Sequence, residues 1–233
     1  MYYTIRTLLP ELYENKHPLL PHMQWIANNV YIAPSPKLTE EGYRVTCIKL
    51  IDNNPQKFEP YDFFAHCFNI LEVVLEEDLI LAGIVVYDFK HMTTEHMLKI
   101  TPICLKKVLL ITEKVYRNKV KGIHYVNAPP FINRLVSIVK QLLKPKMAAR
   151  LFVHDSMDKL FDYIPKEVLP EDYGGDEMSL RKLNELWKQK LIEYKDRFDA
   201  LEKMKVKEEL RPTPLVNDEV LGFHGNFKKL AVD

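Results

Sequence analysis

The chain has 233 residues, of which 47% are hydrophobic, and its formal net charge at pH 7 is +1. That length and apolar content suffice for one substantial domain with appendages, and a near-neutral charge gives no reason to expect nucleic acid as a partner. Three widely spaced cysteines are typical of reduced thiols in a cytosolic protein, and neither a leader sequence nor a bilayer-spanning apolar run is evident.

The first 36 residues contain several prolines, which limit helices there to short segments, so we interpret residues 1–36 as an appendage. Beyond them, apolar periodicity predicts strands at 44–51, 79–89, 120–126 and 149–154, and helices at 59–78, 102–116 and 131–143. Strands that alternate with helices indicate an α/β fold with a mainly parallel sheet.

Residues 179–210 are predicted to form one long helix with an apolar stripe that runs from Leu183 to Leu201. We expect this stripe to dock on the domain rather than to form a coiled-coil dimer, and hence a monomer. The remainder, 207–233, is expected to be an extended tail on the surface.

Familiar catalytic and nucleotide-binding patterns are lacking. Gly174 and Gly175 are flanked by four carboxylates, which would repel a phosphate group; a chain reversal after Pro170 explains them better. The consecutive residues 154–156, His-Asp-Ser, superficially suggest a hydrolase, but neighbours on an extended chain diverge. Histidine spacing does not suit zinc, so we expect neither an enzyme, nor a metal, nor a cofactor.

One stretch is strongly segregated in charge. Residues 114–154 contain many lysines and arginines and no aspartate or glutamate. This stretch predicts a positive face, unless carboxylates from elsewhere in the fold balance its charge. Within it, the helix at 131–143 is apolar around much of its circumference. Either this helix is sandwiched in the core, or it covers an apolar cavity and can face an anionic membrane.

Three blocks in this order, GIVVYDF, VKGIHYVNAPPFINRLVSIVKQLLKPKMAARLFVH and VLPEDYGGDEM, resemble the CRAL-TRIO lipid-binding family. The resemblance is to the branch that includes alpha-tocopherol transfer protein and cellular retinaldehyde-binding protein, and the ending GFHGNFKKLAVD is similar to insect-type relatives. It implies a CRAL-TRIO lipid-binding fold, in which a sheet floor and flanking helices enclose a pocket beneath a mobile lid helix at 130–143. Residues 1–36 would be the remnant of an N-terminal helical domain, either in a short isoform or in a truncated sequence, and 37–206 the lipid-binding domain.

The resemblance implies an intracellular carrier that exchanges one hydrophobic molecule, such as a tocopherol, retinoid or carotenoid, at membranes that contain phosphoinositide. The matching headgroup-binding positions are Lys119, Lys121, Lys146 and Arg150. Apolar residues expected to line the pocket, each of which could instead be plain core, are Phe64, Phe68, Val86, Val108, Ile111, Tyr116, Val120, Ile123, Phe131, Ile132, Leu135, Val139 and Leu143. The alternative is a membrane-recruited adaptor without lipid cargo, whose helix at 179–210 binds another protein.

Overall fold

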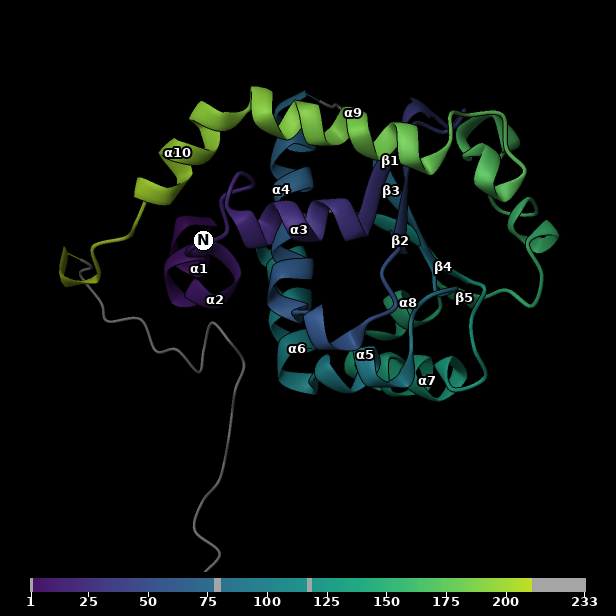
Figure 1. The fold of residues 1–233 in the computed structure, drawn as a ribbon. Helices are drawn as coiled ribbons and strands as arrows, with labels where there is room; N and C mark the ends of the chain where they lie inside the picture. Colours follow the sequence, from purple (N-terminus) through teal and green to yellow (C-terminus); the bar gives the residue numbers. More distant parts are fainter. Residues whose placement is uncertain (1, 78–80, 117–118, 211–233) are drawn as a thin grey trace, which may run out of the picture.

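A computed structural model describes residues 2–77, 81–116 and 119–210 (Figure 1). Its five-stranded sheet has the strands in chain order, with β1 antiparallel to β2 and the other neighbouring pairs parallel. The strands are β1 (Val30–Leu38), β2 (Tyr43–Leu50), β3 (Ala82–Asp88), β4 (Val120–Val126) and β5 (Leu151–Val153). The predicted α/β fold with a mainly parallel sheet is confirmed.

The helices before β4 comprise three short ones at the N-terminus and three between β2 and β4. They are α1 (Tyr2–Leu8), α2 (Pro10–Tyr13), α3 (Pro21–Asn29), α4 (Pro60–Glu77), α5 (Thr94–Lys99) and α6 (Pro102–Ile111), which continues as a π-helical turn, Thr112–Tyr116. Four of them begin at a proline, whose fixed φ suits the first turn and whose missing N–H costs nothing there.

Two helices lie between β4 and β5, and the C-terminal part is helical again. These are α7 (Ile132–Leu142), α8 (Pro145–Ala148), α9 (Leu180–Glu193) and α10 (Lys195–Lys203). Single 3-10 turns lie at Pro55–Lys57, Asp158–Leu160, Lys166–Val168, Glu171–Tyr173 and Glu208–Leu210. The long helix expected over 179–210 is therefore interrupted at Tyr194 and ends at Lys203, but its apolar stripe docks as predicted, with Leu183 and Leu191 buried.

The expected boundary between residues 36 and 37 lies inside β1, a strand that we did not predict. β1 contains Pro34 and Pro36, which a strand tolerates at the edge of a sheet, where β1 lies. The short helices before it share one core with α4, since Ile5, Leu12 and Ile26 pack in the same cluster as the α4 side chains. In this structure the segment 2–36 therefore packs with the rest of the domain and contributes side chains to its core.

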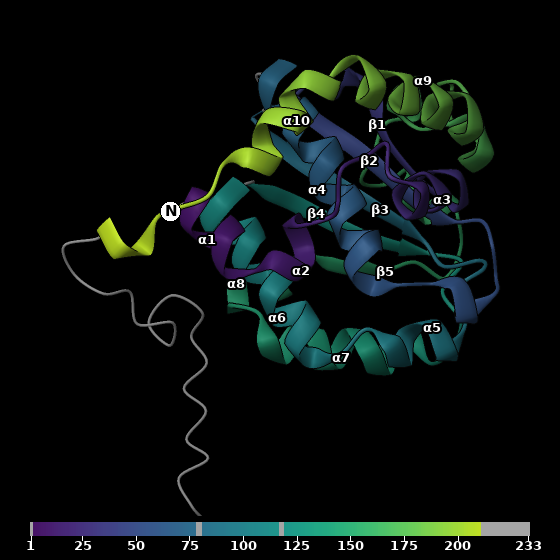
Figure 2. The ribbon, with the colours of Figure 1, turned by 60° about the vertical axis from the view of Figure 1, so that its left-hand side comes forward.

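Side chains on the two faces of the sheet belong to different clusters. Along β3, Tyr87 packs on the face covered by α4 and α7, whereas Ile84 and Val86 pack on the face covered by the segment from residue 157 to α9. Figures 1 and 2 place α9 beside the β1 edge of the sheet and α5, α6 and α7 together on the side of β5. In the described part of the chain, no helix is long and apolar enough to cross a bilayer.

Candidate functional site

An apolar cavity of about 160 Å³ lies between the β3–β4–β5 part of the sheet and the helices α4 to α8. Its lining residues come from both walls and are Phe63, Phe64, Tyr87, Phe89, Met92, Met97, Ile100, Leu105, Val108, Leu109, Ile123, Tyr125, Val136, Val139, Leu143, Met147 and Leu151. Three of these are methionines, whose flexible thioethers adapt to guests of different shape. A volume near 150 Å³ holds a guest of about the size of benzene, so a larger lipid requires the walls to move.

Helix α7 forms one wall of this cavity and is amphipathic. Ile132 and Val136 are buried against the sheet side, whereas Arg134, Ser137 and Lys140 are exposed. Pro130 precedes α7 and Pro145 follows it, so prolines delimit the helix on both sides. Among the described side chains, α7 meets the sheet through apolar residues such as Ile132 and Val136.

Three aromatic rings stand side by side on the floor of the cavity. Tyr87 and Tyr125 are register partners on β3 and β4, with ring centroids 5.7 Å apart, and Phe89 stacks on Tyr125 at 5.3 Å. Burial raises the pKa of both tyrosines above the ordinary value, so both stay protonated. Both residues line the cavity, and among its described lining residues they are the ones that carry a side-chain oxygen.

The structure brings five of the predicted pocket residues together at this cavity, namely Phe64, Val108, Ile123, Val139 and Leu143. Phe131 and Ile132 pack in the neighbouring cluster without lining it. Phe68, Ile111 and Tyr116 belong to the core between α4, α6 and the N-terminal helices, where the Tyr116 hydroxyl donates to Glu72 at 3.0 Å. Val120 does not line the cavity either, and the side chain of Leu135 lies outside the described residues.

The prediction that Val86 lines the pocket is wrong. It is fully buried on the opposite face of the sheet, in the cluster of Val45 and Leu183, so it cannot line the cavity. Side chains of β3 alternate between the faces, and the cavity receives Tyr87 and Phe89 instead. Strand alternation could have identified both tyrosines, because residues in register on parallel strands share a face and Ile123 was already expected there. The contributions of Met92, Met97 and Leu105 had no comparable signal in the sequence.

Three of the four predicted headgroup-binding cations lie near one end of the sheet. Lys119 and Arg150 directly precede β4 and β5, and Lys146 lies on α8, which leads into β5. Lys119 and Lys146 are exposed, whereas the Arg150 guanidinium donates to the Val120 carbonyl oxygen. Among the described residues, Lys144 is the one cation of the acid-free stretch that forms an ion pair, and its partner is Glu113.

Lys121 is turned away from the other three by an irregularity in β4. The register places Gly83 opposite Val120 and Ile84 opposite Gly122, so Lys121 is an extra residue, as in a β-bulge. Its ammonium lies 4.9 Å from the ring centroid of Tyr43, in a cleft lined also by His124. That cleft is on the face opposite the cavity. Alternation alone would have placed Lys121 on the cavity face, and only the bulge changes this.

The three sequence blocks that carried the resemblance meet at one buried carboxylate, Asp88, at the end of β3. Asp88 accepts hydrogen bonds from Asn127 at 2.8 Å and from the Tyr173 hydroxyl at 3.3 Å, and pairs with Lys49 at 3.2 Å. Gly174 has φ +77°, as the predicted chain reversal requires. The stretch VLPEDYGG therefore has a structural role, because its Tyr173 contacts Asp88 and its Gly174 allows the chain reversal.

The side chains of His154 and Asp155 have different partners. The His154 ring is hydrogen-bonded to the His124 ring, with 2.9 Å between Nε2 and Nδ1, and the Asp155 carboxylate pairs with Lys159 at the surface. Burial and the neighbouring His154 hold the pKa of His124 near 4, so the pair is neutral at physiological pH. The hydrolase hypothesis therefore has no support from the geometry.

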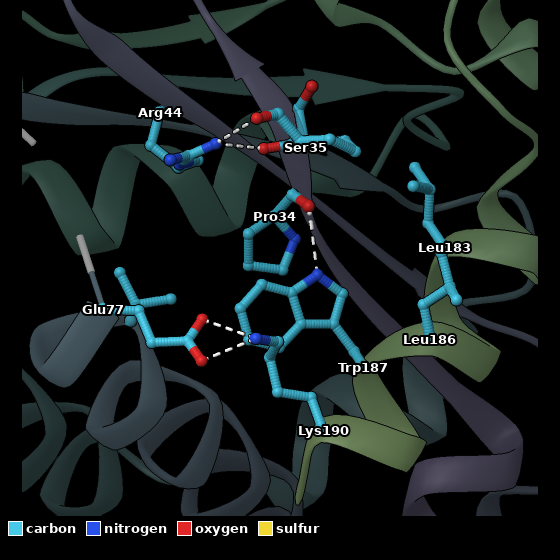
Figure 3. Close-up of a pocket in the computed structure, with 10 residues that line it drawn as sticks. Pro34, Ser35, Arg44, Glu77, Leu183, Leu186, Trp187 and Lys190 are labelled. Atoms are coloured by element: carbon cyan, nitrogen blue, oxygen red, sulfur yellow. Dashed lines mark hydrogen bonds and ion pairs between the residues drawn. The ribbon is translucent and has the colours of Figure 1, made fainter.

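A separate pocket lies between α9, the C-terminal end of α4, residues 34–36 of β1 and Arg44 of β2. Figure 3 shows that the Trp187 indole N–H donates to the Pro34 carbonyl oxygen, at 3.0 Å, while Lys190 pairs with Glu77. Leu186 borders this pocket and is 48% exposed. These contacts fix α9 against β1 and α4.

Comparison with known proteins agrees with this geometry. The family model described as CRAL/TRIO domain matches residues 28–175. The chain is 27% identical over 224 residues to "Alpha-tocopherol transfer protein-like" from Homo sapiens, covering 95% of this chain and 62% of that protein, and 32% identical over 108 residues to "Clavesin-1" from Mus musculus, covering 45% and 30%. The "Crystal structure of Sfh5" superposes with a TM-score of 0.56 at 18% identity over 77% of this chain and 65% of the other, which supports the fold.

Proposed function

The chain belongs to the CRAL/TRIO domain family, and on this premise we propose that it carries one hydrophobic small molecule in the cavity beneath α7. The observation that carries the proposal is the cavity, because its wall is apolar apart from two hydroxyl groups and it lies under an amphipathic helix. The names of the tocopherol transfer relatives support the same function. No covalent chemistry is required, and a monomer that works in the cytoplasm suffices.

We further propose that α7 moves aside to exchange the cargo. A cavity of about 160 Å³ is small for a tocopherol, a retinoid or a carotenoid, so the bound state needs a wider space. The exposed cations Lys119 and Lys146 near α8 would hold an anionic, phosphoinositide-containing membrane next to this helix. Headgroups favour release only if they bind the open state better than the closed one.

A vesicle transfer assay tests the membrane part of this proposal. We expect Lys119→Ala with Lys146→Ala to slow transfer to phosphoinositide vesicles, because each lysine near an anionic surface contributes about 1 kcal/mol, and both together about thirtyfold in binding. Lys121→Ala is the matched control on the opposite face and should transfer at the wild-type rate. Arg150 is left intact because it bonds to Val120. Equal rates for the double variant and the wild type would refute the role of the cations.

The alternative of an adaptor without cargo would use the exposed side of α9. The partly exposed Leu186 beside Trp187 is the feature that favours it (Figure 3). In that case the purified protein would bind membranes, yet would retain no hydrophobic molecule after exposure to lipid.

A further inference from the structure

Helix α5 and the residues next to it form part of the cavity wall. Met92 precedes the helix, Met97 lies in it and Ile100 follows it directly, and all three line the cavity. Figure 2 shows α5, α6 and α7 together along one side of the molecule. A helix of six residues is too short to be stable through its own hydrogen bonds, so contacts at its ends decide whether it forms. The start of α5 therefore controls one part of the wall.

His96 stabilises the first turn of α5. The Thr93 backbone N–H donates to His96 Nδ1 at 3.2 Å, and the Thr93 hydroxyl oxygen lies 2.8 Å from the same nitrogen. In return, the His96 backbone N–H donates to the Thr93 hydroxyl oxygen at 3.4 Å. This is a capping box in which histidine takes the place usually held by glutamate or glutamine. Because Nδ1 accepts from the Thr93 N–H, the ring is neutral and carries its proton on Nε2.

The surroundings of His96 disfavour a positive charge on its ring. The residue is fully buried, and its ring packs edge-on against Phe58 with 5.2 Å between the ring centroids. Nε2 has no hydrogen-bond partner among the described residues. Burial and the Lys99 ammonium lower the pKa of His96 below its ordinary value, whereas the carboxylates of Asp52 and Glu95 oppose this shift. Lys99 is held nearby, because its ammonium donates to the Phe58 carbonyl oxygen at 3.0 Å.

Protonation of His96 would remove the cap. A proton on Nδ1 turns the acceptor of the Thr93 N–H into a donor and places a charge in a buried site. When α5 opens, the ring enters water and takes up a proton near its ordinary pKa of 6.5. The stability of the closed helix is therefore present in full above pH 6.5 and is lost as the pH falls toward the lower pKa of the closed form. Below pH 6.5 the open population rises by at most about tenfold per pH unit.

We propose that His96 is an acid-sensitive switch, whose protonation releases the first turn of α5 and opens the cavity wall at Met97 and Ile100. This inference rests on the proposed carrier function and adds how the same cavity is regulated. An anionic membrane supplies the acid, because its negative surface potential lowers the pH at the surface by about 0.5 to 0.8 of a unit. Opening is thus favoured where the carrier meets such a membrane.

Release of diphenylhexatriene, a neutral apolar fluorophore, from the loaded protein into neutral phosphatidylcholine vesicles tests the inference at pH 7.5 and pH 5.5. The wild type should release the probe faster at pH 5.5, by up to about tenfold, because opening is coupled to the uptake of one proton. His96→Gln keeps an acceptor at the capping position but cannot titrate, so its release rate should be the same at both pH values. His66→Leu, which removes the buried histidine of α4, is the control and should keep the acceleration.

Hydrogen exchange of the α5 amides, corrected for the intrinsic pH dependence of exchange, gives a second readout that needs no cargo. Protection of α5 relative to α4 should fall at pH 5.5 in the wild type and should not fall in His96→Gln. Unchanged protection in the wild type, or the same pH dependence in both proteins, would overturn the inference. If the wild type takes up no diphenylhexatriene at pH 7.5, the carrier function is contradicted, while exchange in α5 still decides whether His96 is a switch. Protection of α4 equal to that of the wild type shows that each variant is folded.

Discussion

His66 on α4 makes the stability of the protein sensitive to pH. Its side chain is buried, Nε2 has no hydrogen-bond partner, and burial lowers its pKa from 6.5 to about 4. Between those values the unfolded chain binds a proton that the folded chain does not, so stability present above pH 6.5 is lost as the pH falls toward 4. We expect a loss of about 2 kcal/mol in the free energy of unfolding on going from pH 7.5 to pH 5 from this residue alone.

Urea unfolding of the wild type and of His66→Leu at several pH values measures this contribution. The variant should lose less stability than the wild type over the same interval, by about 2 kcal/mol. It keeps part of the pH dependence, because the pKa of His124 is lowered too. Identical pH dependence of the two proteins would show that His66 does not titrate as described.

Gly175 is required by a close approach of the backbone. A Cβ at this position would lie 2.0 Å from the Leu169 carbonyl oxygen, whereas one at Gly83 would lie 3.9 Å from the nearest atom, the Arg44 carbonyl oxygen. Gly175→Ala should therefore destabilise the protein by roughly 2 kcal/mol or more through overpacking, and Gly83→Ala by much less. Thermal unfolding of both variants checks this, and equal melting temperatures would contradict it.

At the residue scale, the sequence predicts which residues are apolar better than it predicts where they point. Phe64, Ile123 and Val139 do line the cavity, but Val86 does not, because one step along a strand reverses the face. The position of Lys121 depends on a bulge that no residue pattern announces. Face assignment needs the register between strands, which a single sequence does not contain.

At the scale of elements, α9 is held by one face. Leu183 is 1% exposed and packs against the sheet, whereas Leu186, on the next turn, is 48% exposed. Leu183→Ala should cost about 3 kcal/mol in the free energy of unfolding, through lost burial and the cavity left behind, and Leu186→Ala about 0.5 kcal/mol or less. Chemical denaturation of the two variants compares them directly. Similar losses would mean that α9 is not docked in this orientation.

Elements with strong periodicity were predictable, and those fixed by tertiary contacts were not. The bounds of β4 agree with the predicted strand at 120–126, and α4 and α7 differ from the predicted helices by one residue at each end or less. β1 escaped prediction because its prolines argue against a strand, and only its place at the sheet edge makes them tolerable. The break at Tyr194 likewise has no proline or glycine to mark it.

At the scale of the whole molecule, the two faces of the sheet differ in kind. One face bears the cavity and the amphipathic α7, and the other bears a tightly packed core that contains Leu160, Ile164 and Tyr173. The motif VLPEDYGG belongs to the second face, where it ties Asp88 to the chain reversal at Gly174. The cavity shares its face with the core cluster built on α4, which contains Phe63 and Phe64, so substitutions of these two residues would affect both stability and the proposed cargo binding.

The most direct test of the carrier account is native mass spectrometry of the protein after incubation with lipid vesicles, compared with Val139→Trp, which fills the cavity from α7. The account predicts one hydrophobic molecule per wild-type chain, released into organic solvent, and a much smaller bound fraction for the folded variant. A wild-type chain that leaves the vesicles without any added mass, or a variant that carries the same load, would contradict it.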